Sequence, residues 1–104
     1  MLSIVDNDIS ICKDDDCYLL FYFTAKWCGP CKNITPSIEE ISKKLCEKID
    51  FFKIEIDDEA NEEICEKCQI KSVPTFILLK ARNSLGIVNG ADLKNLLILI
   101  KKNI

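Results

Sequence analysis

The stretch Trp27-Cys28-Gly29-Pro30-Cys31-Lys32 stands where an apolar run ends and a helical pattern begins. The preceding run, Cys17 to Phe23, is almost continuously apolar and aromatic, which is typical of a central strand covered on both faces. The junction therefore places two thiols at the N-terminus of a helix. Because unpaired N–H groups and the helix dipole stabilise a thiolate there, the stretch predicts a reversible dithiol.

The spacing of the two cysteines fits a disulfide that opens and closes without moving the fold. Cys28 would cap the helix and Cys31 would lie one turn inside it, within disulfide reach. Gly29 permits a tight turn into the helix, and Pro30 stiffens the first turn, where its missing N–H costs nothing. We expect Cys28 to be the exposed nucleophile and Cys31 the inner, resolving thiol.

Length and charge limit the class of protein. The 104 residues, 48% of them hydrophobic, predict a single domain over 1–104 with its own core. The formal net charge is -3 and no basic stripe is present, so nucleic acid is not an expected partner. No signal peptide and no membrane-spanning stretch of roughly 18 apolar residues is found, so we expect a cytoplasmic protein without a membrane partner. We also expect a monomer.

Seven cysteines and no histidine limit the chemistry. An odd number of cysteines cannot all pair within one chain, which indicates mostly reduced thiols. Without histidine there is no Cys–His or Ser–His pair and no imidazole metal ligand. Thiols, carboxylates and lysines must carry any reaction, and we expect no cofactor and no metal.

Strand and helix patterns alternate along the chain. Ile34, Ile38, Ile41, Leu45 and Ile49 recur every three or four residues and predict one buried helical stripe from residue 32, kinked at Pro36. In residues 51–56, Phe52, Ile54 and Ile56 should share one face of a strand. Further strands are predicted over 3–5, 17–23, 76–79 and 85–88, and helices over 8–15, 59–68 and 92–104.

The order of these elements predicts an α/β fold. Early alternation of strand and helix favours parallel strands, and the short turn 81–84 makes the last two strands antiparallel. We expect a central mixed sheet with parallel strands and a C-terminal antiparallel hairpin, flanked by helices on both faces.

The dithiol and several distant positions together resemble the thioredoxin family. The active-site motif is matched by Ala25-Lys26-Trp27-Cys28-Gly29-Pro30-Cys31-Lys32, and other matches follow in order over nearly the whole chain: Pro36, Ile54-Glu55-Ile56-Asp57, Val73-Pro74-Thr75-Phe76 and Gly90-Ala91. The resemblance implies the thioredoxin fold, here with a shortened N-terminal region and a stunted or missing first helix. It also implies a thiol-disulfide oxidoreductase that reduces protein disulfides, in which Cys28 attacks and Cys31 resolves.

The resemblance also implies roles around the dithiol. Pro74 would be cis and pack beside it, and the Val73 backbone would pair with a bound substrate segment. Trp27 would belong to a flat apolar surface, and Gly90 would let a partner's backbone come close. Taken without the resemblance, Pro74 is a trans turn and Trp27 a core residue.

Partners follow from the same resemblance. Disulfide-containing client proteins would be the substrates. Because no dinucleotide or flavin motif is present, electrons would come from a separate thioredoxin reductase, which places the chain in electron transport and cell redox homeostasis. The alternative is a thioredoxin-like interaction or redox-sensor module with little turnover. An oxidase or isomerase of a secretory compartment would carry a more polar residue than Pro30 and a targeting signal.

Tyr22 departs from the family pattern. Six residues before Cys28, thioredoxins usually carry a buried Asp that exchanges protons with the inner cysteine, while the matching lysine is present as Lys53. Because a buried unpaired ammonium would cost several kcal/mol, we expect Lys53 to reach outward or to pair with Glu55 or another carboxylate. Cys31 would then be deprotonated more slowly, by water or by Lys53.

Cys65-Glu66-Lys67-Cys68 is a second Cys-x-x-Cys motif. Cys65 and Cys68 could form a regulatory disulfide, or one could pack as a small apolar side chain while the other stays an unreactive thiol. A zinc site shared with the first pair is disfavoured, because 33 residues separate the pairs against about 15–20 in compact zinc ribbons. Cys12, Cys17 and Cys46 are interpreted as packing residues, with surface oxidation or dimerisation open to Cys12 or Cys46.

Replacing Tyr22 with Asp should speed the second step of the exchange, because it restores an internal carboxylate behind Cys31. The measurement is the decay of a mixed disulfide on Cys28 in a single turnover. An unchanged decay rate in Tyr22→Asp would contradict the hypothesis.

Overall fold

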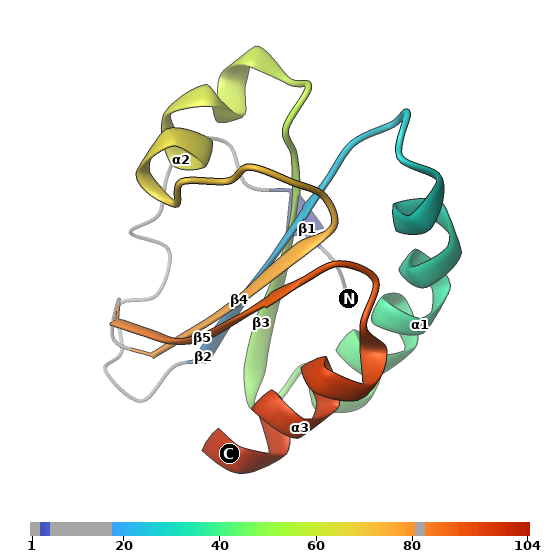
Figure 1. The fold of residues 1–104 in the computed structure, drawn as a ribbon. Helices are drawn as coiled ribbons and strands as arrows, with labels where there is room; N and C mark the ends of the chain where they lie inside the picture. Colours follow the sequence, from blue (N-terminus) through green and yellow to red (C-terminus); the bar gives the residue numbers. More distant parts are fainter. Residues whose placement is uncertain (1–2, 5–17, 81–82) are drawn as a thin grey trace.

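The computed structural model describes residues 3–4, 18–80 and 83–104, which form a sheet with helices on both faces (Figure 1). The elements in chain order are β1 (Ser3–Ile4), β2 (Tyr18–Thr24), α1 (Gly29–Leu45), β3 (Ile49–Glu55), the 3-10 helix η1 (Glu59–Asn61), α2 (Glu62–Lys67), β4 (Thr75–Lys80), β5 (Asn83–Asn89) and α3 (Leu93–Asn103). The strand order is β1-β3-β2-β4-β5. β1, β3 and β2 are parallel, whereas β4 is antiparallel to both its neighbours. The predicted mixed sheet with its C-terminal antiparallel hairpin is confirmed.

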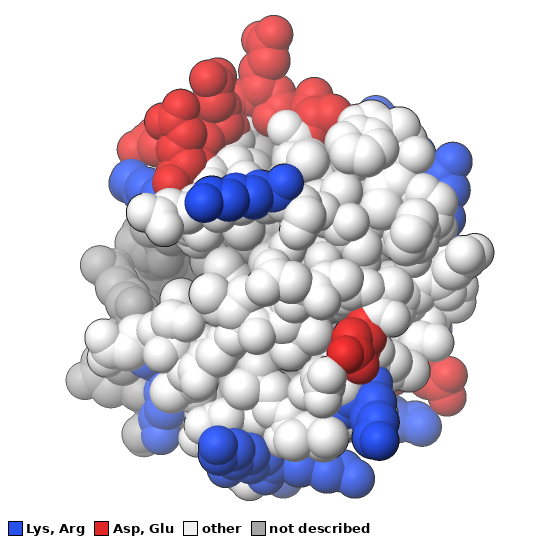
Figure 2. Space-filling model, viewed as in Figure 1, with Lys and Arg blue, Asp and Glu red and all other residues white. Residues whose placement is uncertain are grey.

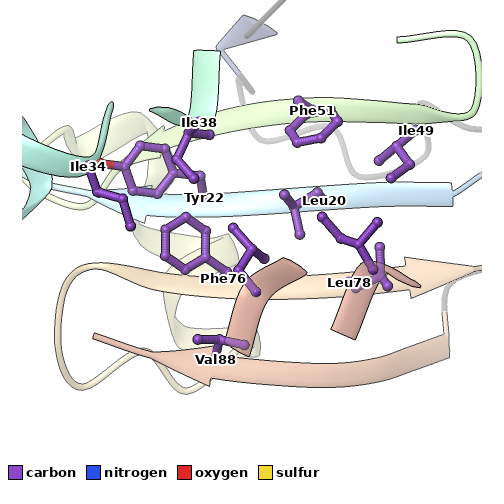
Figure 3. Close-up of a cluster of buried hydrophobic side chains, with 11 residues drawn as sticks. Leu20, Tyr22, Ile34, Ile38, Ile49, Phe51, Phe76, Leu78 and Val88 are labelled. Carbon is purple, nitrogen blue, oxygen red and sulfur yellow. The ribbon is translucent and has the colours of Figure 1, made fainter. Parts of the chain in front are cut away.

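Each face of the sheet carries its own hydrophobic core. α1 and α3 cover one face and α2 the other (Figure 1). Figure 3 shows the first core, in which Tyr22 and Phe76 from the sheet meet Ile34 and Ile38 from α1. The second core joins Phe23 and other strand side chains to α2. Helices therefore flank both faces, as predicted.

The alternation in β3 assigns its residues to the two cores as expected. Phe51 packs toward α1, whereas Phe52 and Ile54 belong to the core under α2, with Ile56 packed against it. Side chains alternate across a strand, so one strand supplies both cores. The predicted faces of this strand are confirmed.

The predicted helical stripe is too long by one member. Ile34, Ile38, Ile41 and Leu45 do pack in the first core, but α1 ends at Leu45 and Ile49 begins β3. A turn follows the helix, in which the Lys48 N–H donates to the Leu45 carbonyl at 2.9 Å. Ile49 continued the helical spacing only because its strand position is buried in the same core.

Several helix ends are capped by side chains. The Asp92 carboxylate accepts the Asn95 N–H at 3.1 Å and starts α3, and Asp58 accepts the Ala60 N–H at 3.0 Å at the start of η1. The single helix predicted over 59–68 is instead η1 followed by the short α2. Pro36 lies inside α1, which continues to Leu45, so a kink there stays a prediction.

Two predictions fall on the first part of the chain. The short first strand is present as Ser3–Ile4 and pairs with β3. The polar helix predicted over 8–15, the shortened N-terminal region, and Cys12 and Cys17 lie outside the described residues.

Replacing Phe76 with Ala should lower the free energy of unfolding by about 3–5 kcal/mol, because it opens a cavity in the first core. Phe76 has no exposed surface, and its ring stacks on Tyr22 with centroids 4.9 Å apart. Urea unfolding measures the change. The control is Ile87→Ala on β5, whose side chain is 54% exposed and should cost under about 0.5 kcal/mol. Equal losses in the two variants would contradict this core assignment.

Candidate active site

The dithiol lies at the junction of β2 and α1. Cys28 and Cys31 form a disulfide with their Cα atoms 5.3 Å apart, and the Cys28 sulfur accepts the Cys31 N–H at 3.2 Å as the helix cap. The predicted capping position is confirmed. The expectation that Cys28 is exposed is wrong: Cys28 is 4% exposed and Cys31 1%, because Ala25, Ile56 and Val73 pack against the pair.

The loop before β4 closes over the first cysteine. The Val73–Pro74 peptide bond is cis, as the resemblance implied, so the trans alternative is wrong. The Val73 carbonyl oxygen lies 3.8 Å from the Cys28 sulfur, and the Pro74 carbonyl accepts the Gly90 N–H at 2.8 Å. Gly90 has φ of +93°, a conformation that favours glycine, and its open side has no atom within 4 Å of an added Cβ. The end of β5 thus holds the loop that faces the dithiol.

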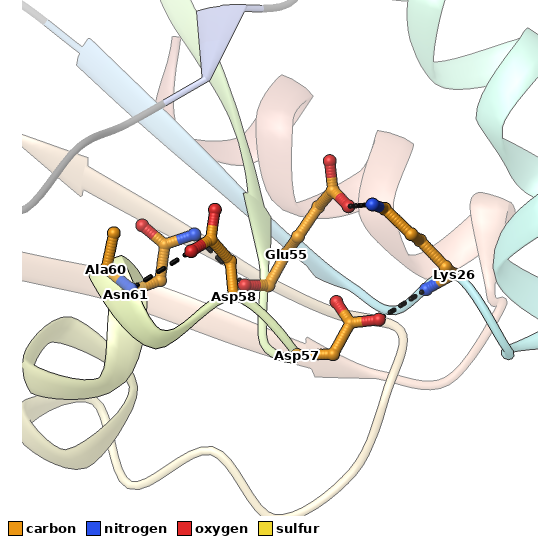
Figure 4. Close-up of polar contacts among 6 residues, drawn as sticks. All are labelled: Lys26, Glu55, Asp57, Asp58, Ala60 and Asn61. Atoms are coloured by element: carbon orange, nitrogen blue, oxygen red, sulfur yellow. Dashed lines mark hydrogen bonds and ion pairs between the residues drawn. The ribbon is translucent and has the colours of Figure 1, made fainter.

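Trp27 projects from the loop between β2 and α1. Its side chain is 69% exposed, so the alternative of a core residue is wrong. Figure 4 shows the neighbouring contacts that hold this loop: the Lys26 N–H donates to Asp57 at 3.3 Å, and the Lys26 ammonium lies 3.9 Å from the Glu55 carboxylate. Gly29 has neither a positive φ nor a neighbour within 4 Å of an added Cβ, so the predicted tight turn does not require it.

Tyr22 lies directly behind the dithiol and is completely buried. Its hydroxyl is 3.0 Å from the Cys31 carbonyl oxygen and 2.8 Å from the Thr35 Oγ1 atom. The Thr35 hydroxyl donates to the same carbonyl at 2.7 Å. A neutral hydroxyl pair therefore fastens the first turn of α1 to the sheet. Sequence reasoning missed Thr35, although a threonine four residues after Cys31 in a helix is placed to bond that carbonyl.

Lys53 is half-buried beside Tyr22, with which it is in register across β2 and β3. Glu55 pairs with Lys26, and Lys53 makes no ion pair with any residue that the structure describes, so of the two alternatives for Lys53 the pairing with a carboxylate is wrong. The reason is that Lys53 opens into a recess of about 360 Å³, where water can solvate it. That recess is lined by Thr24, Ala25, Lys26, Lys32, Thr35, Lys53 and Glu55.

The second cysteine pair is half-buried against the core under α2. Burial raises the pKa of both thiols above the ordinary value of 9.0, and for Cys65 the neighbouring Cys68 raises the pKa further. Cys65 lies in α2 and Cys68 at its C-terminal cap, the opposite end of a helix from the one that Cys28 caps. Cys46 is exposed at the end of α1, so its interpretation as a packing residue is wrong.

Across residues 3–4, 18–80 and 83–104, no group of three or more Cys, Asp or Glu side chains is arranged to hold a metal ion. Within the same ranges, none of the helices is both long and apolar enough to cross a membrane.

The sequence and the fold of this chain match those of known proteins. The thioredoxin family model matches residues 6–102. The chain belongs to the thioredoxin family. Among curated thioredoxins it is 39% identical over 94 residues to mitochondrial thioredoxin O1 of Arabidopsis thaliana, covering 88% of this chain and 48% of that relative. It is 43% identical over 83 residues to the thioredoxin of Rickettsia bellii, covering 80% of this chain and 77% of the relative. The chain thus spans about half the length of the first relative.

Solved thioredoxin structures confirm the fold. The crystal structure of Malassezia sympodialis thioredoxin superposes with a TM-score of 0.86 at 28% identity, over 97% of this chain and 91% of the other. Plasmodium falciparum thioredoxin gives a TM-score of 0.76 at 39% identity, over 84% and 82%. Membership of the thioredoxin family and the Cys28–Cys31 disulfide together support thiol-disulfide oxidoreductase chemistry at this site.

The raised pKa values of Cys65 and Cys68 predict slow reaction at neutral pH. Both thiols should stay protonated below pH 9.0, so alkylation by iodoacetamide should accelerate only above it, and in urea the acceleration should begin at lower pH. The raised pKa of the two thiols also stabilises the fold. This contribution is fully present below pH 9.0 and is lost as pH rises through the folded-state pKa.

Peptide mapping measures the alkylation of Cys65 and of Cys68 separately. A Cys65–Cys68 disulfide formed by mild peroxide at pH 7 would contradict the expectation and support the regulatory alternative.

Proposed function

We propose that this thioredoxin-family chain reduces disulfide bonds in client proteins. The observation that carries the proposal is the placement of the Cys28 sulfur, which caps α1 and lies 3.8 Å from the Val73 carbonyl. An extended client segment that pairs with the Val73 backbone would bring its own sulfur atoms to Cys28. A module that only docks partners has no physical need for a dithiol in this position.

The surface around the dithiol favours a protein client. Trp27 supplies an exposed apolar platform on one side, and the open space over Gly90 accepts backbone on the other. Figure 2 shows a broad face, between acidic side chains over α2 and lysines near α3, that carries few charged side chains. Such a face suits varied client segments, because it demands no particular charge.

The reaction follows from the two thiols. The Cys28 thiolate attacks one client sulfur, a mixed disulfide forms, and the second client sulfur leaves as a thiolate. Cys31 then attacks the Cys28 sulfur, which closes the Cys28–Cys31 disulfide and releases the reduced client. Electrons pass from the dithiol to the client, so the chain needs a separate reductase to reopen its disulfide. We infer a thioredoxin reductase as that donor, and a cytoplasmic location in which the chain serves electron transport and redox homeostasis.

Reduction of insulin by dithiothreitol tests the proposal. The chain should accelerate precipitation of the insulin chains, and Cys28→Ser should fall to the uncatalysed rate because the nucleophile is lost. Cys46→Ser is the matched control, since it removes an exposed thiol far from the dithiol and should keep the full rate.

A second variant identifies the intermediate. Cys31→Ser should hold a mixed disulfide between Cys28 and insulin, which mass spectrometry would detect, because no resolving thiol remains. An unmodified chain with no turnover above the uncatalysed rate would overturn the proposal and favour the interaction or sensor module.

A further inference from the structure

The second step of the exchange needs a base, and Tyr22 does not supply one. Before Cys31 can attack, its thiol must lose a proton, because the thiolate is the nucleophile. The Tyr22 hydroxyl is already committed to the Cys31 carbonyl and to Thr35, at 3.0 and 2.8 Å. The proton must therefore leave by another route.

The recess that Lys53 lines also borders two residues that touch Cys31. Ala25 packs against the cysteine pair, and the Thr35 hydroxyl donates to the Cys31 carbonyl at 2.7 Å. The recess measures about 360 Å³. That is far more than the roughly 30 Å³ that one water molecule occupies in the liquid, and hydroxyl and charged groups line it. Water in the recess can therefore reach Ala25 and Thr35, which touch Cys31, as well as the other lining groups.

Glu55 is the carboxylate that lines this recess. It is in register with Thr24 across β2 and β3, two residues after Lys53 on the same face of its strand. Its side chain is 19% exposed and is held loosely by Lys26 at 3.9 Å. Figure 4 shows this carboxylate turned toward Lys26 at the edge of the sheet. A lysine ammonium has donors but no acceptor, so the three lysines of the recess cannot take a proton as a carboxylate can.

We propose that Glu55 accepts the Cys31 proton through water in this recess during the second step. This inference rests on the proposed disulfide reduction and names a group that assists it. The Cys31 S–H bond breaks, the proton passes to the Glu55 carboxylate, and the Cys31 thiolate attacks the Cys28 sulfur. The bond between Cys28 and the client breaks, and the client sulfur leaves with its electron pair and takes up a proton from water.

Charged groups of both signs surround the Glu55 carboxylate. From the sheet, the β2–α1 loop and α1, three lysines line the recess: Lys53, Lys26 and Lys32. From the loop after β3 and from η1, three carboxylates share the adjoining groove with Glu55 and Lys26, those of Asp57, Asp58 and Glu59. These acids and lysines leave the charges around Glu55 mixed in sign.

The test separates the two steps with dithiobis(nitrobenzoate) as the disulfide substrate. After rapid acid quench, peptide mapping counts the Cys28–thionitrobenzoate adduct and the Cys28–Cys31 disulfide at each time. Glu55→Gln should form the adduct at the normal rate and resolve it roughly a hundredfold more slowly at pH 7.

The pH profile distinguishes a proton acceptor from a structural role. Without the carboxylate, resolution should rise about tenfold per pH unit and approach the unmodified rate at alkaline pH, where solvent removes the proton. Glu55→Asp should restore most of the rate at pH 7. Lys26→Met breaks the ion pair but keeps the carboxylate, so the profile should keep its shape. Glu59→Gln is the charge-matched control, because it removes a neighbouring carboxylate that does not line the recess.

Equal resolution rates and profiles in Glu55→Gln and the unmodified chain would overturn the role of Glu55. The same would follow if Lys26→Met or Glu59→Gln reproduced the defect. Failure of the unmodified chain to form any Cys28 adduct would instead overturn the proposed function, so the two failures are distinguishable.

Discussion

The position of the reactive disulfide depends on how the first turn of α1 is fastened to the sheet. Tyr22 comes from the middle of β2, and its ring is clamped against Phe76 of the neighbouring strand. Its hydroxyl reaches the carbonyl of Cys31, and Thr35 closes the same contact from within the helix. Each such hydrogen bond contributes about 0.5–1.5 kcal/mol, and because the groups are buried, leaving one unpaired would cost more. The turn that carries both cysteines is thereby held at one place on the sheet.

In the family pattern, the residue at the position of Tyr22, a buried acid, both fills the space behind the inner cysteine and exchanges protons with it, whereas here these two tasks are separated. Here the tyrosine fills the space and satisfies the carbonyl, while charged groups are displaced to the recess at the end of β3. The chain thus keeps a well-packed core beneath the dithiol. With Glu55 as the proposed proton acceptor, the proton chemistry takes place in the recess, which water can reach.

The two Cys-x-x-Cys motifs show how position changes the same chemistry. Cys28 begins a helix, where the free N–H groups favour a thiolate, and its sulfur accepts one of them. Cys65 and Cys68 lie at the end of a helix against a hydrophobic core, where burial raises their pKa. Identical spacing therefore goes with a disulfide at the start of one helix and with half-buried thiols of raised pKa at the end of another.

The sequence by itself determined the class of fold, the dithiol and its capping position. These follow from local rules: the alternation of β3, the spacing in α1, the length of the last turn and the Cys-x-x-Cys motif at a strand-to-helix junction. The cis bond before Pro74 was accessible only through the family resemblance, since isolated X-Pro bonds are mostly trans. The exposure of Trp27 was likewise expected only from that resemblance. Only the tertiary structure decided how deeply Cys28 is covered and that Glu55 pairs with Lys26 rather than Lys53. The reason is that burial and ion pairing depend on contacts between segments that are distant in the chain. The spacing of residues within one segment does not determine those contacts.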